Sequence, residues 1–221
     1  MDLGHAICNR RSIRKFLKDA LPANTIKEII EKATWCPSWG NTQPWDVVVV
    51  TGPALEKLKN ENKAAILSGK APQPDMPMPE NWPVAMKKRY ADVGKQVLGS
   101  LSIKREDKKG RKDHYADMFY FFDAPALLIF TVDTQLPVGY AALDTGIFIQ
   151  NICLLAQEKK IGTCILAAAI HFPDIVRKIC SIPDNKRLVI GMAMGYPDNN
   201  SPVNQFKRDR ISSNDFVTWT T

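Results

Sequence analysis

Arginine side chains alternate with other residues near both ends of this chain. The first stretch is RRSIRKF (10–16), the second is FKRDR (206–210), and the alternating residues are Arg10, Ser12, Arg14, Arg208 and Arg210. Residues two apart share one face of an extended segment, so each stretch can present guanidinium groups along one edge. Arginine offers forked donors that match oxyanions. Together the two stretches predict a phosphate-binding site; the alternative is ordinary solvated surface.

The stretch PSWGNTQPW (37–45) has a different chemistry. It contains two prolines, two tryptophans, one glycine and four uncharged polar residues. None of these side chains titrates near neutral pH, so the stretch cannot move a proton. It offers amide donors and acceptors for the edges of a flat heterocycle and apolar surface for its face. This composition predicts a loop that binds a ring.

The net charge of +7 favours an anionic partner, which could be nucleic acid, a phosphate-bearing cofactor or a carboxylate substrate. The basic runs are not interleaved with aromatic residues and carry no recognised motif, so we expect no nucleic-acid binding. The sequence has no G-x-G-x-x-G, P-loop or nucleophile elbow, and its three histidines lack metal-ligand spacing. An enzyme with this sequence would therefore leave the difficult chemistry to a non-metal cofactor.

Cysteine usage and hydropathy bear on the compartment. The five cysteines are scattered, odd in number and form no C-x-x-C pair, which predicts free thiols in a reducing environment. The N-terminal residues show no secretory signal, and no apolar run approaches the roughly 18 residues that span a bilayer. We therefore expect a cytoplasmic protein that does not bind a membrane.

Hydrophobic periodicity predicts more helices than strands. Apolar residues at helical spacing follow Asp2, and further helices are expected over 22–34, 53–67, 84–98, 106–121, 138–160 and 172–180. Continuous apolar, β-branched runs predict strands over 46–50, 126–133 and 186–198, with a short strand or turn over 163–170. Without a repeat or a linker, this order predicts one three-layer α+β domain over residues 1–221.

Three segments raise questions of packing. Residues 70–83 contain five prolines and are either a surface loop or an active-site lid carrying Met76, Met78 and Trp82. Helix 138–160 is apolar almost all round, which predicts burial on most sides, and a partner subunit is one way to achieve it. The polar tail 199–221 carries aromatic anchors and is expected to pack on something.

The order of these motifs resembles the nitroreductase family of FMN-dependent oxidoreductases. The resemblance rests on RRSIRKF, PSWGNTQPW, a GTC turn after a long helix, LVIGMAMGYPD and the C-terminal Arg-x-Arg, and it covers essentially the whole chain. GRKDHYADMFYFFDAPALLIFTVD resembles the branch that includes nitrobenzoate reductases. The resemblance implies an α+β sandwich with a mostly antiparallel central sheet flanked by helices, and an intertwined homodimer with two FMN sites at its interface.

The resemblance also implies roles for individual residues. Arg10, Arg11, Ser12 and Arg14 match the first FMN motif, with Arg10 at the phosphate and Arg14 at the N1/O2 edge of the flavin. A charge there would favour reduced flavin, which is anionic at N1. Arg208 and Arg210 match the phosphate-binding pair of the tail. The loop that reaches the flavin from the partner subunit matches Pro37, Ser38, Trp39 and Asn41, braced by Gln43 and Trp45.

Two features depart from the common pattern of the family. Leu166, Ala167 and Ala168 fall where a backbone N–H meets flavin N5, and many relatives have glycine there. Alanine keeps the N–H group but restricts φ. Trp39 is bulky where small residues are common, which is expected to narrow the pocket or change its substrates.

The implied reaction is a ping-pong transfer of hydride from NADH or NADPH, through flavin N5, to a nitroaromatic or quinone acceptor. The sequence shows no protein acid or base for it, so no catalytic residue is assigned. The acceptor pocket is expected to include His114, Tyr115 and Phe119, although core packing would equally explain Phe119 and surface exposure His114. The alternatives are a specialised relative acting on another aromatic or on flavin, and a flavin-binding or nucleic-acid-binding protein without turnover.

Overall fold

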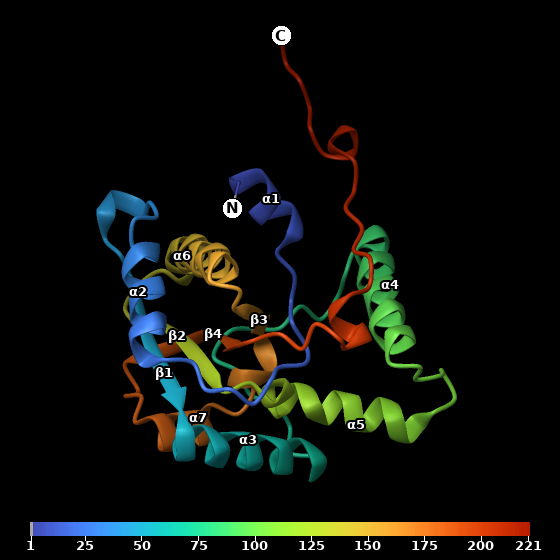
Figure 1. Ribbon diagram of the computed structural model, residues 1–221. Helices are drawn as coiled ribbons and strands as arrows, with labels where there is room; N and C mark the ends of the chain where they lie inside the picture. The colour runs from blue at the N-terminus through green and yellow to red at the C-terminus, as the bar shows by residue number, and fades with distance from the viewer. Residues whose placement is uncertain (1) are drawn as a thin grey trace.

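Residues 2–221 are described by the computed structural model, which contains seven α-helices and four strands in this range (Figure 1). The helices are α1 Leu3–Asn9, α2 Ala23–Ala33, α3 Gly52–Leu67, α4 Val84–Ser100, α5 Lys108–Phe119, α6 Val138–Glu158 and α7 Pro173–Cys180. The strands are β1 Trp45–Thr51, β2 Ala126–Asp133, β3 Gly162–Leu166 and β4 Lys186–Gly195. Each predicted element is present, and the ambiguous segment 163–170 divides into β3 and a 3-10 turn.

The four strands form one antiparallel sheet in the order β1-β2-β4-β3. Strand β2 is central, and every residue from Ala126 to Val132 is buried, as expected for a continuous apolar run. The pairing of Val48 with Ile129 and of Leu128 with Met192 sets the register on its two sides. The mostly antiparallel sheet that the family resemblance implies is confirmed.

Helices cover both faces of this sheet, which gives the three layers (Figure 1). Leu127 and Ile129 of β2 point into the core beneath α3, α5 and α7. Leu128 and Phe130 alternate with them and pack against α2 and α6. Because side chains of a strand alternate between faces, β2 supplies both cores.

Helix α6 is buried on one side only. Phe148 and Ile152 pack into the core, whereas Tyr140 and Leu143 are 56% and 58% exposed. The expected burial on most sides is therefore not achieved within one chain. Between residues 2 and 221, α6 is also the one helix long and apolar enough, by length and composition alone, to suit a membrane span. Its packing against the sheet is that of a core helix.

The first part of the proline-rich segment 70–83 is tied to the body of the protein. The N–H of Gln73 donates to the carbonyl of His171 at 2.9 Å. The carboxylate of Asp75 accepts from Arg177 Nη2 at 2.5 Å and from the N–H of Leu188 at 2.7 Å. Residues 74–76 are half-buried, whereas 70–73 and 77–83 are exposed. Because Gln73 and Asp75 are tied to the body, a moving lid would have to lie within 77–83.

A buried lysine supports an unusual backbone turn before β2. Phe121, Phe122 and Asp123 all have positive φ, between 54° and 57°, although none is glycine. Such conformations cost of order 1–3 kcal/mol each and need support from their surroundings. Lys59 of α3, which is 2% exposed, supplies it through ion pairs with Asp123 at 3.0 Å and Glu56 at 2.7 Å. Burial is the main cause that lowers the pKa of Lys59.

We predict that Asp123→Ala lowers the free energy of unfolding by about 2 kcal/mol. The variant leaves Lys59 buried with one carboxylate instead of two, which costs less than the roughly 3–5 kcal/mol for a fully broken buried pair. Urea unfolding followed by circular dichroism measures the loss. Asp117→Ala is the control, because its partner Lys63 lies on the surface and such pairs contribute under about 1 kcal/mol. Equal losses in the two variants would contradict the role given to Lys59.

Candidate cofactor and substrate site

The segment 10–16 is extended and lies beside β3. The N–H of Ile13 donates to the carbonyl of Thr163 at 2.9 Å, and Ser12 forms a parallel bridge with Thr163. Ile13 is buried in the core, as the alternating pattern predicts. The polar residues on either side of it are therefore held at the edge of the sheet.

Asn204 joins this segment to the C-terminal tail. Its Oδ1 accepts from the N–H of Arg14 at 2.8 Å, and its Nδ2 donates to the carbonyls of Lys15 and Asp198 at 2.8 and 2.9 Å. Its own carbonyl accepts from Arg11 Nη1 at 2.7 Å. One buried amide thus brings two stretches nearly 200 residues apart into contact.

Five arginines border one small cavity at this junction, with a volume of about 160 Å³. These residues, called the arginine cluster below, are Arg10, Arg11, Arg14, Arg208 and Arg210. Ser12 and Asn204 also border the cavity, and its one acidic residue, Asp209, accepts a hydrogen bond from Gln96. Arg208 donates to the carbonyls of Arg10 and Cys8. The structure thus gathers both predicted stretches into a strongly positive cavity.

The charge of the arginine cluster acts on its own members. The pKa of Arg208 is lowered by burial first, and then by the positive charges of Arg11, Arg210 and Arg10. Like charges held close together raise the free energy of the folded protein unless an anion lies among them. The cavity is therefore suited to a phosphate group.

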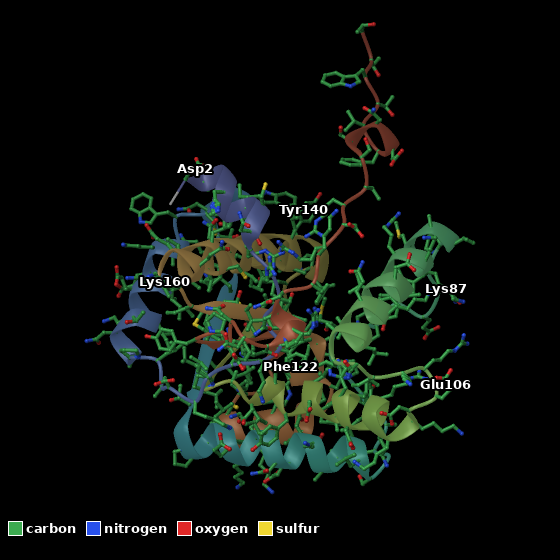
Figure 2. All side chains as sticks on the ribbon, turned by 45° about the vertical axis from the view of Figure 1, so that its right-hand side comes forward. Asp2, Lys87, Glu106, Phe122, Tyr140 and Lys160 are labelled. Carbon is green, nitrogen blue, oxygen red and sulfur yellow. The ribbon has the colours of Figure 1, made fainter. Side chains whose placement is uncertain are left out.

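A second cavity, about 650 Å³ in volume, lies between α4 and α5 and is called the α4–α5 cavity. Arg14 borders both cavities, and its guanidinium carbon lies 5.9 Å from the ring centroid of Phe206. Figure 2 shows α4, marked by Lys87, and the segment before α5, marked by Glu106, on the same side of the molecule. The cluster and the larger cavity are thus adjacent.

Two of the three residues predicted for an acceptor pocket border the α4–α5 cavity, namely His114 and Tyr115. Burial lowers the pKa of His114, the charge of Arg14 lowers it further, and Asp117 opposes both. His114 is therefore neutral at pH 7. Phe119 does not border the cavity: it is 1% exposed and packs against His171 and Phe172 in the core. Phe119 therefore lies on the inner face of α5 and packs in the core, which was the alternative to a place in the acceptor pocket.

Residues 166–168 form the end of β3 and the start of a 3-10 turn. Asn62 of α3, fully buried, donates from Nδ2 to the carbonyl of Ala168 at 3.0 Å. Gly191 of β4 lets Ala169 approach, because a Cβ added at Gly191 would lie 2.3 Å from the Cβ of Ala169. These contacts hold the turn against the sheet.

The loop 37–45 lies on the far side of the chain, near α6 (Figure 1). The N–H of Trp39 donates to Asp144 at 3.0 Å, and its ring meets Tyr140 edge to face. Gln43 bonds to Ser38 and Asn41, and Trp45 stacks on Phe148 at 4.6 Å. No residue from 37 to 41 borders either cavity. A single chain therefore does not bring this loop to the arginine cluster.

Sequence reasoning missed three positioning residues: Asn204, Asn62 and Gly191. Asn204 lies in a polar tail without periodicity, and Asn62 is a polar residue on a helix where exposure is the usual expectation. Gly191 lies within a strand pattern, where an isolated glycine is a recognised signal of close backbone approach. Only that last signal was available from the sequence.

Comparison with known proteins agrees with this architecture. The model of the nitroreductase family matches residues 7–196. The chain is 33% identical to a nitrobenzene nitroreductase of Ectopseudomonas oleovorans, covering 96% of this chain and 94% of that protein. It is 31% identical to a 4-nitrobenzoate reductase of Pseudomonas putida, covering 98% and 94%. The chain belongs to the nitroreductase family.

Two solved structures extend the comparison to the fold. The FMN and NADPH-dependent nitroreductase NfnB from Sphigopyxis sp. strain HMH superposes with a TM-score of 0.95 and 27% sequence identity, covering all of both chains. NfnB from Mycobacterium smegmatis, solved in complex with NADPH, gives a TM-score of 0.91 at 27% identity over the same coverage. These likenesses establish the nitroreductase fold of this chain.

We predict that Asn204→Ala lowers the free energy of unfolding by about 2–3 kcal/mol, because it removes three part-buried hydrogen bonds, to the N–H of Arg14 and the carbonyls of Lys15 and Asp198. Chemical denaturation measures the change. Asn200→Ala is the matched control, since Asn200 is an exposed asparagine of the same tail. Similar stability of the two variants would show that Asn204 does not hold the tail and the segment 10–16 together.

Proposed function

We propose that residues 1–221 form one FMN-binding domain of an NAD(P)H-dependent oxidoreductase that reduces a nitroaromatic or quinone acceptor. The observation that carries this proposal is the arginine cluster, whose five guanidinium groups have no adequate counter-charge among the residues described. A phosphate monoester provides that charge, and guanidinium groups match its oxygens. The FMN and NADPH dependence of the structural relatives supports the same cofactors.

The residues present fit FMN in three further respects. Arg14 borders both cavities, so its charge would lie beside the N1/O2 edge of a flavin whose phosphate is in the cluster. The turn at Leu166, Ala167 and Ala168 would offer a backbone N–H to N5. The loop 37–45 would reach a flavin that is held mainly by the partner subunit, and its contacts would be made by Pro37, Ser38, Trp39 and Asn41. Ser12, Arg208 and Arg210 would complete the phosphate site.

FMN would supply the redox chemistry by accepting a hydride from NAD(P)H and passing it to the acceptor. The protein would bind the two substrates one after the other in the same cavity, which is ping-pong order. Tyr115 and His114 would form part of its wall, and a neutral His114 adds no positive charge beside Arg14. Because no side chain is assigned as acid or base, water or the flavin itself would deliver the protons.

The absorption spectrum of the purified protein tests this proposal directly. We expect flavin bands that bleach when NADPH or NADH is added without oxygen and return when a nitroaromatic is added. A colourless protein that cannot be reconstituted with FMN would refute the proposal. Flavin bands that neither donor bleaches would restrict the protein to flavin binding.

Arg14→Ala provides a sharper test. We predict that it weakens FMN binding roughly tenfold, the effect of losing one charge-assisted hydrogen bond, and lowers the reduction potential of the flavin. Fluorescence titration and dye-coupled redox titration measure the two effects. Lys15→Ala removes the same charge from the neighbouring exposed side chain and is the control. An unchanged affinity and potential in the Arg14 variant would exclude its contact with the cofactor.

We also propose a homodimer, because part of the site and part of the apolar surface are unpartnered in one chain. Tyr140 and Leu143 of α6 are exposed, as are Leu3 and Ile7 of the neighbouring helix α1. The tail extends away from the body and exposes Ile211, Phe216, Val217 and Trp219 (Figure 1). Burial of these side chains by a second copy would stabilise the assembly.

Light scattering during size-exclusion chromatography tests the dimer. The expected mass is twice the chain mass of 24.8 kDa, and removal of residues 211–221 is expected to weaken association. A monomer at micromolar concentration would contradict the proposal. A cytoplasmic location is proposed on separate grounds, because all five cysteines are free thiols, as predicted.

A further inference from the structure

The α4–α5 cavity is apolar along most of its wall. Val93 and Val97 of α4 face it from one side and Met118 of α5 from the other. Two aromatic residues, Tyr90 and Tyr115, also line it and are largely exposed. Its volume of about 650 Å³ lies within the range of roughly 300–1,000 Å³ that is typical of small-molecule sites. Such a wall suits a flat aromatic body.

One part of this cavity is basic. Lys108, Arg111 and Lys112, all at the beginning of α5, border it, and no aspartate or glutamate does. These three residues are called the basic rim. Over the part of the chain that the structure describes, none of the three has a carboxylate within ion-pair distance. Arg111 donates from Nη1 to the backbone carbonyl of Arg105 at 3.2 Å, and that carbonyl carries no counter-charge. The positive charges of the three residues are therefore available to a ligand.

Neighbouring lysines behave differently. Lys109, on the same turn of α5 but outside the cavity, pairs with Asp113 at 2.6 Å. Lys63 of α3 pairs with Asp117 of α5 at 3.1 Å. The carboxylates of α5 therefore neutralise cations that lie away from the cavity and leave the basic rim uncompensated.

The basic rim lies at a distance from the arginine cluster. Lys108 and Tyr115 are seven residues apart, which is about 10 Å along a helix axis. His114 also borders the cavity and lies six residues after Lys108 and two after Lys112, whereas Arg14 borders the cavity from the segment 10–16. A molecule whose reacting group lies near Arg14 can therefore extend a second, charged group to the rim.

We propose that the basic rim is a binding site for an oxyanion group on the substrate that occupies the α4–α5 cavity. The inference rests on the proposed function and adds a preference for negatively charged substrates. Two sources supply the same chemistry: a carboxylate on a nitroaromatic acceptor, or a phosphate of the nicotinamide dinucleotide. Guanidinium and ammonium groups bind both, and hydrocarbon walls bind the aromatic part of either.

The test compares two double variants of the FMN-loaded protein with equal changes in net charge. Lys108→Gln/Lys112→Gln removes two charges from the rim. Lys104→Gln/Lys109→Gln removes two charges from the same region outside the cavity. Comparing the two double variants separates the effect of a local contact at the rim from long-range attraction by the net positive charge of the chain.

Each variant is assayed at saturating NADPH with two acceptors, 4-nitrobenzoate and nitrobenzene. We expect the rim variant to lower the ratio of kcat/KM for 4-nitrobenzoate over nitrobenzene about fivefold, mainly through KM, since exposed ion pairs contribute modestly. The control variant should retain the wild-type ratio. Calorimetric titration of the oxidised holoenzyme with 4-nitrobenzoate should show the same loss of affinity, decreasing as salt is added.

A second arm identifies the source of the oxyanion. The KM values for NADPH and NADH are measured at saturating nitrobenzene. A rise in both values in the rim variant, but not in the control variant, would assign the rim to a phosphate that the two dinucleotides share. A rise for NADPH only would assign the rim to the 2′-phosphate. If the rim and control variants match in both arms and in calorimetry, the inference is overturned. Wild-type reduction of nitrobenzene in that case would leave the proposed function intact, whereas a wild type that reduces neither acceptor would contradict the proposed function itself.

Discussion

Repulsion among five guanidinium groups is the constraint on which the proposed site depends. The chain brings Arg10, Arg11 and Arg14 from its beginning and Arg208 and Arg210 from its end to one small cavity. Two unit charges 4 Å apart repel by about 1 kcal/mol in water and about 4 kcal/mol at the effective dielectric of a protein surface. Asn204 holds the two segments together against this repulsion by accepting hydrogen bonds from Arg11 and Arg14 and donating one to the carbonyl of Lys15. A phosphate in the cavity would turn the same charges into a source of stability.

The sheet determines where this cluster lies. Strand β2, buried on both faces, needs a helical layer on each side, and β4 beside it carries β3 and then the segment 10–16 at the edge. The turn after β3 is held by Asn62 and fits closely over Gly191, so its backbone is as well supported as the strands. The loop 37–45 lies across the sheet beside α6. The distance between this loop and the cluster is the structural reason for expecting a site shared by two subunits.

The relatives of this chain are named for substrates of different charge, which bears on the α4–α5 cavity. Relatives of this chain include a nitrobenzene nitroreductase, whose named substrate is neutral, and a 4-nitrobenzoate reductase, whose named substrate carries a carboxylate. In the proposed function, the wall of valine, methionine and tyrosine would accept the ring of either molecule. Charge at the rim would distinguish them, because an unpaired lysine attracts a carboxylate more strongly than it attracts an uncharged ring. Selectivity can therefore change on the surface of α5 without any change in the core.

The sequence by itself determined the order and type of the helices and strands, the α+β class and the chemistry of the two arginine stretches. These follow from local periodicity and residue type, which act over a few neighbouring residues. The continuous apolar run ALLIFTVD predicts a buried strand, and the alternation in RRSIRKF places arginines on either side of a buried Ile13. Only the tertiary structure decided that Phe119 belongs to the core, that one face of α6 stays exposed, and that Asn204 joins the two ends of the chain. It also decided which lysines of α5 face a cavity without a carboxylate. Those facts depend on contacts between residues far apart in sequence, and no local pattern specifies which distant partner a side chain meets.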